Sequence, residues 1–290
     1  MKKFKGCIIL FIASIVWGFA FVAQRIGGDI GTYTFNGIRF LLGSISILPV
    51  IFIFEKNSDP VKAKASILPG ILIGIVLFAA STFQQYGIVL TDYAGKSGFI
   101  TDFYIILVPI LGLFLKQRPS IQAWIGAIIA LFGFYFLCMN NNQFTINFGD
   151  FLLFICAIIF SVQILAIDHY SKKVYPLQLS LYQFLTCSIL SFICSFMFET
   201  VELNSLKDAL IPLLYGGIMS VGVGYTLQAV GQSMTDATSA SIIMSSEAVF
   251  CSLGTALFLH EVMPIRSYFG CLLVFIGILL AQIPSKEKSC

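Results

Sequence analysis

The feature that most constrains this chain is a succession of apolar segments, each about as long as a helix that crosses a membrane. A helix rises about 1.5 Å per residue, so about 20 mostly apolar residues cross a hydrocarbon core about 30 Å thick. Ten segments meet this length: 6–24, 34–54, 67–90, 95–115, 120–139, 149–168, 178–198, 209–229, 238–259 and 264–284. We therefore predict an all-α integral membrane protein with ten transmembrane helices.

The composition excludes several other classes of protein. Charged residues make up 11% of the 290 residues and apolar residues 58%, whereas a soluble domain carries about 25% charged residues. A soluble globular enzyme, a disordered chain and a nucleic-acid-binding protein are therefore excluded. The segments are continuous apolar runs, such as residues 67–80, and not the alternating segments of about 10 residues found in a membrane β-barrel.

The positions of lysine and arginine predict the orientation, because these residues are retained on the cytoplasmic side of spanning helices. With the N-terminus in the cytoplasm, the inner segments hold twelve of the 17 lysines and arginines and the outer segments four, and Arg39 lies within a span. We therefore expect both termini in the cytoplasm and the chain in an inner or plasma membrane. The charge-free stretch 6–23 is longer than the apolar part of a cleaved signal, about 7–15 residues, so we expect a retained first span.

The chain matches itself when it is shifted by 144 residues. The shift superimposes Gln84 on Gln228, Gly87 on Gly231, Phe114 on Phe258, Gly126 on Gly270, Gly133 on Gly277 and Phe40 on Phe184, and Gly6 matches Gly149 at a shift of 143. These matches predict two five-helix repeats, residues 1–140 and 141–290. Because five is odd, the repeats must have opposite orientations in the membrane. Such inverted repeats are typical of secondary transporters, which bind substrate near the midplane between the halves.

Short motifs along these spans resemble those of EamA-type members of the drug/metabolite transporter superfamily. They are Trp17-Gly18, Arg39-Phe40, residues 94–100, Val108-Pro109, residues 246–250 and residues 259–261. The resemblance covers essentially the whole chain and implies export or exchange of small metabolites, commonly amino acids. The family pattern often has proline after the glutamate of the ninth span and glycine before the loop glutamate, where this chain has Ala248 and His260.

Three charged residues stand out because they lie at least five residues from either end of a predicted span: Arg39, Asp102 and Glu247. A charge at the centre of a span costs roughly 2.5–3.5 kcal/mol on insertion scales, so it persists where it is paired or lines a wet cavity. Glu247 lies about 12 Å from the inner end of its span and Asp102 about 10 Å from the outer end of its own. Either acid is a candidate substrate or proton site, and a structural hydrogen bond to a neighbouring helix is the alternative.

Arg39 enters the second span from the outer side, at a depth similar to that of Asp102. We predict that the two form an ion pair with a structural or gating role. The alternative is that Arg39 binds a substrate carboxylate through two parallel hydrogen bonds.

Uncharged polar and aromatic side chains in the spans complete the candidate substrate or coupling site, because ligand pockets combine apolar walls with a few polar anchors. The candidates are Trp17, Asn36, Gln84, Gln85, Tyr86, Tyr104, Tyr182, Gln183, Tyr225 and Gln228. Gln24 and Gln163 are two further amides in or near spans. Interhelical hydrogen bonding is the alternative for each polar residue. Pro109, in the middle of the fourth span, removes a backbone hydrogen bond and predicts a kink.

The sequence thus predicts a secondary transporter that moves a small metabolite, such as an amino acid, outward or by exchange. The partners that we expect are this metabolite and the surrounding membrane lipid, and the residues are compatible both with proton coupling and with downhill exchange. We predict no cofactor, no metal and no nucleic-acid partner. The alternatives are an intramembrane enzyme that acts on a lipid and a non-transporting sensor or subunit of a larger complex.

Overall fold

The computed structural model describes residues 2–55, 59–91, 94–138, 147–200, 203–260, 265–281 and 283, which form helices and no strand. The first part of the chain contains α1 (Lys2–Ile26), η1 (Gly27–Ile30), α2 (Thr32–Phe54), α3 (Pro60–Ala65), α4 (Ile67–Leu90), α5 (Ala94–Thr101), α6 (Tyr104–Phe114) and α7 (Ile121–Cys138). The second part contains α8 (Phe148–Tyr170), α9 (Pro176–Phe198), α10 (Leu203–Asp208), α11 (Leu210–Leu214), η2 (Tyr215–Tyr225), α12 (Thr226–Gln232), α13 (Ala237–Met244), α14 (Glu247–Phe258) and α15 (Ile265–Ala281).

Eight stretches of the described chain are long and apolar enough to cross a membrane. They are 2–30, 32–54, 60–90, 95–114, 148–170, 176–198, 210–232 and 237–258. The fifth and tenth predicted spans correspond to shorter apolar stretches, Ile121–Gly133 in α7 and Tyr268–Ala281 in α15. The prediction of an all-helical, multi-pass membrane protein is therefore confirmed.

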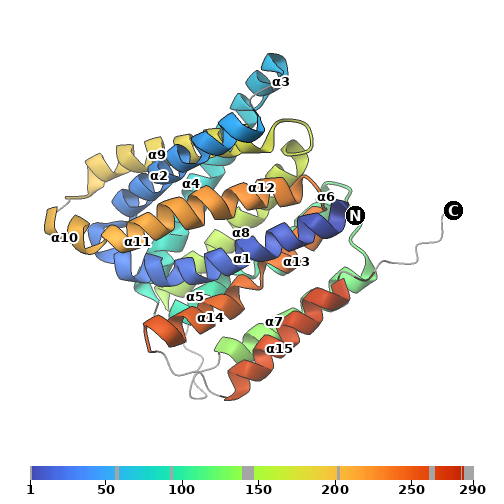
Figure 1. Ribbon diagram of the computed structural model, residues 1–290. Coiled ribbons are helices and arrows are strands. Elements are labelled where there is room, and N and C mark those ends of the chain that lie inside the picture. The colour runs from blue at the N-terminus through green and yellow to red at the C-terminus, as the bar shows by residue number, and fades with distance from the viewer. Residues whose placement is uncertain are drawn as a thin grey trace.

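The helices pack so that each part of the chain lies against the other. In the first part, α4 packs on α8 and α9, and α1 packs on η2, α12 and α14. Helix α2 lies between α9 and η2. Figure 1 shows α1 crossing the middle of the molecule, with α12 on one side of it and α14 on the other. The centre of the bundle is therefore built from both parts of the chain.

Glycines lie where these helices cross most closely. A Cβ atom on Gly6 of α1 would lie 2.9 Å from the carbonyl oxygen of Gly231 in α12. A Cβ atom on Gly87 of α4 would lie 3.0 Å from the carbonyl oxygen of Gly149 in α8. Small residues at such crossings let helix backbones approach each other in a membrane protein.

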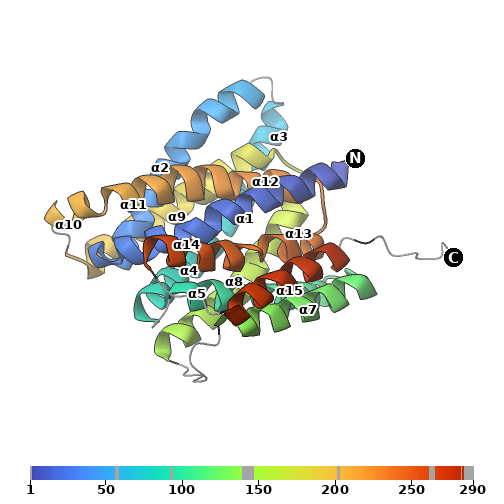
Figure 2. The same cartoon turned by 60° about the horizontal axis from the view of Figure 1, so that its bottom comes forward.

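Helices α7 and α15 form an antiparallel pair beside the bundle, which both ribbon views show (Figures 1 and 2). Gly126 of α7 faces Gly277 of α15, and Gly133 faces Gly270, so the two helices run in opposite directions. A crevice of about 980 Å³ lies between α7 and helices α5 and α8. Its wall is mostly aromatic and includes Phe99.

Two spans are broken at their midpoints. The fourth is divided at Asp102 and Phe103, between α5 and α6, and the ninth at Ser245 and Ser246, between α13 and α14. Pro109 lies inside α6, so the break precedes the proline that was expected to bend this span. In both broken spans the second helix begins with a polar side chain directed into the protein.

The ends of α2 and α9 cap each other. The Glu199 carboxylate, just after α9, accepts hydrogen bonds from the Tyr33 N–H (2.9 Å), the Thr34 N–H (2.7 Å) and the Thr34 hydroxyl (2.7 Å) at the start of α2. Glu55, just after α2, accepts a bond of 3.2 Å from the Leu177 N–H at the start of α9. Burial raises the pKa of Glu55, although the hydrogen bond from Leu177 acts in the opposite direction.

Candidate functional site

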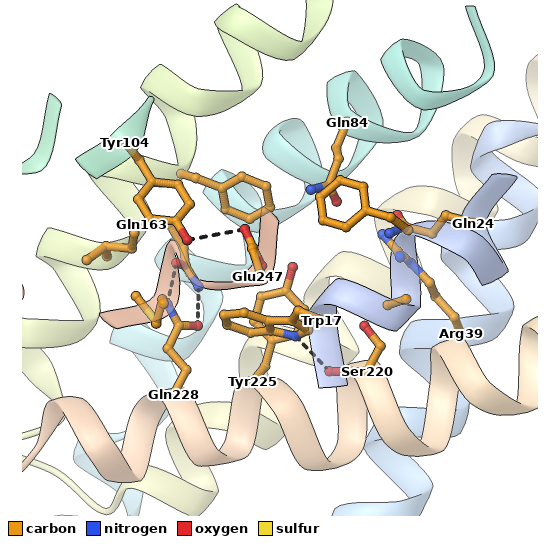
Figure 3. Close-up of a pocket in the computed structure, with 15 residues that line it drawn as sticks. Trp17, Gln24, Arg39, Gln84, Tyr104, Gln163, Ser220, Tyr225, Gln228 and Glu247 are labelled. Atoms are coloured by element: carbon orange, nitrogen blue, oxygen red, sulfur yellow. Dashed lines mark hydrogen bonds between the residues drawn. The ribbon is translucent and has the colours of Figure 1, made fainter. Parts of the chain in front are cut away.

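A small cavity lies at the centre of the bundle, where the two parts of the chain meet (Figure 3). Its volume is about 30 Å³, and a water molecule needs about 10–15 Å³ on this measure. In this conformation the cavity therefore has room for two or three waters and none for a metabolite. Its lining is Trp17, Ala20, Phe21, Gln24, Arg39, Gln84, Tyr104, Phe160, Gln163, Ile164, Ser220, Tyr225, Gln228, Met244 and Glu247.

Seven of the residues chosen from the sequence line this cavity. They are Trp17, Arg39, Gln84, Tyr104, Tyr225, Gln228 and Glu247. They come from seven elements in both parts of the chain, namely α1, α2, α4, α6, η2, α12 and α14. Gln84 and Gln228, which match each other under the shift of 144 residues, both line this cavity.

Six other candidates lie outside the lining. Asn36 and Gln85 are buried and join helices, because the Asn36 amide donates to the Ser81 carbonyl (3.2 Å) and the Gln85 amide donates to the Gln24 carbonyl (2.9 Å). The remaining members of this group are Asp102, Tyr86, Tyr182 and Gln183. For Asn36 and Gln85, interhelical hydrogen bonding is the role that the structure shows.

The last three aromatic and amide candidates occupy helix contacts. Tyr86 packs edge-on against Tyr33, with ring centroids 5.8 Å apart. Tyr182 lies on α9 at its contact with Gly70 of α4. Gln183 is fully buried on α9, and its amide has no hydrogen-bond partner in the part of the chain that the structure describes.

Glu247, Asp102 and Tyr104 form a cluster at the breaks of the two discontinuous spans. The Tyr104 hydroxyl donates to Glu247 Oε1 at 3.2 Å, which Figure 3 shows, and the Ala248 N–H donates to Asp102 Oδ2 at 3.2 Å. Asp102 and Glu247 are buried, with exposed fractions of 0% and 5%, and the Asp102 carboxyl group lies against the first turn of the helix that Glu247 begins. The two acids predicted to approach from opposite sides of the membrane therefore meet.

Arg39 lies in the cavity wall without an acidic partner. The ion pairs among the described residues are Lys3–Asp236, Lys96–Asp150 and Lys172–Asp168, so the predicted Arg39–Asp102 pair is not formed. Asp102 is directed toward α14, whereas the Arg39 guanidinium lies over the rings of Phe35 and Phe40, 5.5 and 5.1 Å from their centroids. Arg39 is 1% exposed, and within the described residues its Nε and Nη2 atoms have no hydrogen-bond partner.

The floor of the cavity is held by aromatic and amide contacts. The Trp17 and Tyr225 rings lie 4.8 Å apart, and the Trp17 indole N–H donates to the Ser220 carbonyl at 3.1 Å. Ser220 belongs to η2, an 11-residue π-helical stretch, and π-helical turns are frequent at functional sites. The side-chain amides of Gln163 and Gln228 bond each other twice, at 3.1 and 3.3 Å (Figure 3).

Sequence reasoning missed one polar lining residue, Ser220. Gln24 and Gln163, two further amides noted from the sequence within apolar segments, also line the cavity. Ser220 contributes its backbone carbonyl, and no sequence pattern points to that group. In the described part of the chain, no group of three His, Cys, Asp or Glu side chains could hold a metal ion.

Membrane-length helices packed around a buried polar cavity define a polytopic membrane protein. Comparison with known proteins gives the family: the EamA-like transporter family matches residues 4–139 and again residues 147–282. The chain belongs to the EamA-like transporter family. It is thus a membrane transporter for small molecules, and the resemblance found in its motifs is confirmed.

Relatives agree with this assignment over nearly the whole chain. An uncharacterized transporter of Archaeoglobus fulgidus is 30% identical over 285 residues, which cover 98% of this chain and 87% of that protein. The uncharacterized transporter YoaV of Bacillus subtilis is 24% identical, over 92% of this chain and 93% of that protein. A crystal structure with 18% sequence identity superposes with a TM-score of 0.80 and covers 96% of each chain, which shows a shared fold.

Proposed function

We propose that this chain is a secondary transporter that exports or exchanges small amphiphilic metabolites, foremost amino acids, by alternating access. The observation that carries the proposal is the central cavity. A cation, a carboxyl cluster, four lining glutamines and several aromatic rings converge there from both parts of the chain. Apolar walls with a few converging polar groups are typical of small-molecule sites.

The proposed architecture is ten spanning helices in two inverted repeats, residues 1–140 and 141–290, with α7 and α15 as the fifth and tenth spans. Residues that match under the shift occupy equivalent places. Glu55 and Glu199 cap each other's helices, and Phe40 and Phe184 meet with ring centroids 6.3 Å apart. The second helices of the two broken spans begin at Tyr104 and Glu247, a separation of 143 residues.

The antiparallel direction of matched helices supports the inversion. α7 and α15 run in opposite directions along their glycine contacts, and α2 and α9 must do so because the end of each caps the start of the other. If both pairs cross the membrane, the repeats face opposite sides of it. Together with the lysine and arginine distribution, this supports the proposal that both termini lie in the cytoplasm and that the protein lies in an inner or plasma membrane.

The size of the cavity supports alternating access. A volume of about 30 Å³ admits no metabolite, so substrate must enter after a movement of one repeat against the other, as in other transporters built from inverted repeats. The conformation described here is therefore closed around its site. Opening toward either side would separate helices at one end of the bundle while the other end stays packed.

Proton coupling is the role that we propose for Asp102 and Glu247. Two carboxyl groups that lie close together in a buried site repel each other when both are ionised, so in this proposal the pair shares a proton. Tyr104, which donates to Glu247, links this proton to the cavity. Substrate or solvent entering the cavity would change the environment of the pair and with it the proton's release.

The test is counterflow in liposomes that contain the purified protein. We expect entry of labelled amino acid from a standard mixture when the vesicles are preloaded with the unlabelled mixture. Glu247→Gln should reduce this flux at least tenfold, whereas Asp208→Asn, at the end of α10, should leave it unchanged. No counterflow by the wild type with any amino acid would refute the proposal, and product formation on lipid without flux would favour an enzyme.

A further inference from the structure

We propose that the aromatic crevice beside α7 binds one phospholipid, with an acyl chain in the crevice and the headgroup phosphate at Lys96. The crevice, of about 980 Å³, lies between α7 and helices α5 and α8 and shares none of its described lining residues with the central cavity. The inference goes beyond the proposed function and does not depend on it. It assigns a lipid site to the side of the bundle where the α7–α15 pair lies (Figures 1 and 2).

The crevice is a recess that opens toward the surrounding lipid. Phe132 of α7 and Phe151 of α8 form its rim and are 61% and 54% exposed. Phe99 and Ile100 of α5 lie at its back and are buried. All four belong to apolar helices, so an apolar molecule in the bilayer has direct access to the back of the recess.

The size and the walls of the crevice call for an apolar occupant. An empty apolar recess is unfavourable, because its walls lose packing contacts and water finds no hydrogen-bond partner inside. An engineered apolar cavity of about 150 Å³ stays dry and binds benzene. The crevice, at about 980 Å³, is several times larger and accommodates a flexible hydrocarbon chain. Membrane lipid is the abundant source of such chains.

The crevice extends over one leaflet of the membrane. Lys96 lies at the start of the span 95–114 and Phe103 near its midpoint, about 10 Å apart at helical rise. The hydrocarbon of one leaflet is about 15 Å thick, half of a core of about 30 Å. A spanning helix from a second copy crosses both leaflets and would extend past the end of the crevice, whereas the chain of a lipid lies within its own leaflet.

A buried ion pair marks the end of the crevice at the membrane surface. Lys96 Nζ lies 2.5 Å from Asp150 Oδ2, and both residues line the crevice. The Thr91 hydroxyl donates to Asp150 Oδ1 at 2.8 Å, so the protein holds this carboxylate in place. An ammonium has three N–H donors, so Lys96 can bond a phosphate oxygen as well as Asp150. A cation above an apolar recess thus complements the phosphate and the acyl chain of a phospholipid.

The far end of the crevice reaches the break in the fourth span. Phe103, at this break, packs edge-on against Phe99 and Phe154, with ring centroids 5.3 and 6.0 Å apart. All three rings line the crevice, and the next residue, Tyr104, lines the central cavity. A bound chain therefore packs on one face of the broken span while the central cavity lies on another.

Photolabelling in vesicles tests this site. The full chain is reconstituted in equal parts of phosphatidylethanolamine and phosphatidylglycerol, with a small share of phosphatidylglycerol that carries a diazirine near the middle of one acyl chain. A parallel sample carries the same chain on diacylglycerol, which lacks the phosphate. After illumination, mass spectrometry of peptides locates the adducts. We expect adducts on Phe99 and Ile100, because these side chains are buried and a lipid chain reaches them through the crevice.

The headgroup contact is tested by comparing the two probes. We expect the phospholipid probe to label Phe99 and Ile100 about tenfold more than the diacylglycerol probe, which corresponds to about 1.4 kcal/mol. Lys96→Gln should abolish this preference, and Lys96→Arg should keep it because the charge remains. Arg118→Gln, which removes an exposed cation after α6, should leave the preference unchanged.

The crevice itself is tested by filling it. Ile128→Trp places a larger side chain in the crevice wall and should reduce labelling of Phe99 and Ile100 by both probes severalfold. Leu72→Trp on α4 is the matched control, because Leu72 and Ile128 are both 47% exposed. If Lys96→Gln fails to fold, the filled variant and the diacylglycerol comparison still decide the question.

Three results would overturn the inference: no adduct at Phe99 or Ile100, equal labelling by the two probes, or equal losses in Ile128→Trp and Leu72→Trp. Adducts between two copies of the chain in place of lipid adducts would assign the crevice to a second copy and overturn it as well. None of these results bears on the transporter proposal, because the experiment measures no flux.

Discussion

Replacing Glu199 with alanine removes the cap that the end of α9 places on the start of α2. The wild-type carboxylate accepts three hydrogen bonds, from the Tyr33 N–H, the Thr34 N–H and the Thr34 hydroxyl, at 2.7–2.9 Å. The N–H groups of a first helical turn have no partner within the helix. Loss of Glu199 therefore leaves both amides to be satisfied by solvent or to remain unbonded.

The magnitude follows from two contributions. Loss of a side-chain cap costs about 1 kcal/mol, and loss of a negative charge at a helix N-terminus costs a further 0.3–1 kcal/mol or so. We expect Glu199→Ala to lower the free energy of unfolding by about 1.5–2 kcal/mol. Glu199→Gln keeps an acceptor oxygen and loses the charge, so it should cost about half as much. Glu55→Ala, which loses one bond of 3.2 Å, should cost about 0.5–1 kcal/mol.

The free energy of unfolding can be measured by titrating the protein in mild detergent with a denaturing detergent and following helix content. Asp29→Asn, an exposed acid of η1 close to the start of α2, is the control for charge on the same surface. Glu55 and Glu199 lie at opposite ends of helices about 30 Å long, so the double variant should show additive losses. A Glu199→Ala protein as stable as Asp29→Asn would refute the capping argument.

Further predictions concern stability at other positions. Gln228→Leu leaves the buried Gln163 amide unpaired and should cost about 1–3 kcal/mol, whereas the double change of both glutamines to leucine should recover most of that loss. Equal stability of the single and double variants would contradict this. His260 and Lys116 have φ values of 54° and 61°, so His260→Gly and Lys116→Gly should each raise stability by up to about 1 kcal/mol; an unchanged thermal midpoint would argue against strain. Because burial raises the pKa of Glu55 above the ordinary 4.5, the folded protein binds this proton more tightly than the unfolded chain does. Stability should therefore fall as pH rises from about 4.5 through the raised folded value, and Glu55→Gln should flatten that slope.

The helices and their close crossings follow well from the sequence. Apolar runs of membrane length give the positions of the spans, since burial in lipid demands them. The shift of 144 residues pairs Gly87 with Gly231, and the structure places both at tight crossings of equivalent helices. Small residues allow close approach wherever two helices cross, so matching glycines in the two parts of the chain indicate matching helix crossings.

The site follows less completely, because depth along a helix says nothing about the direction in which a side chain points. Gln84 and Gln85 are neighbours, yet successive residues of a helix point about 100° apart. Gln84 lines the cavity and Gln85 bonds to α1 instead. The expected Arg39–Asp102 pair fails for the same reason, since similar depths on two helices do not bring side chains together.

The sequence analysis did not predict the two helix breaks, because it expected the fourth span to bend at Pro109. The fourth span divides at Asp102 and the ninth at Ser245 and Ser246, where short polar side chains lie at the midpoint of an apolar segment. Serine and aspartate side chains compete with backbone hydrogen bonding. A pair of polar residues at matching places in both halves is the signal that would have located these breaks.

The broken spans match in position but not in chemistry. Under the shift of 144 residues, Asp102 stands where the other half has Ser246, and Glu247 stands where the first half has Phe103. In the alternating-access cycle that we propose, two identical halves would give the inward-open and outward-open states equal free energy. The two acids stand at positions that do not match between the halves, so the inward-open and outward-open states should differ in free energy. We therefore expect the empty transporter to favour one of these two states.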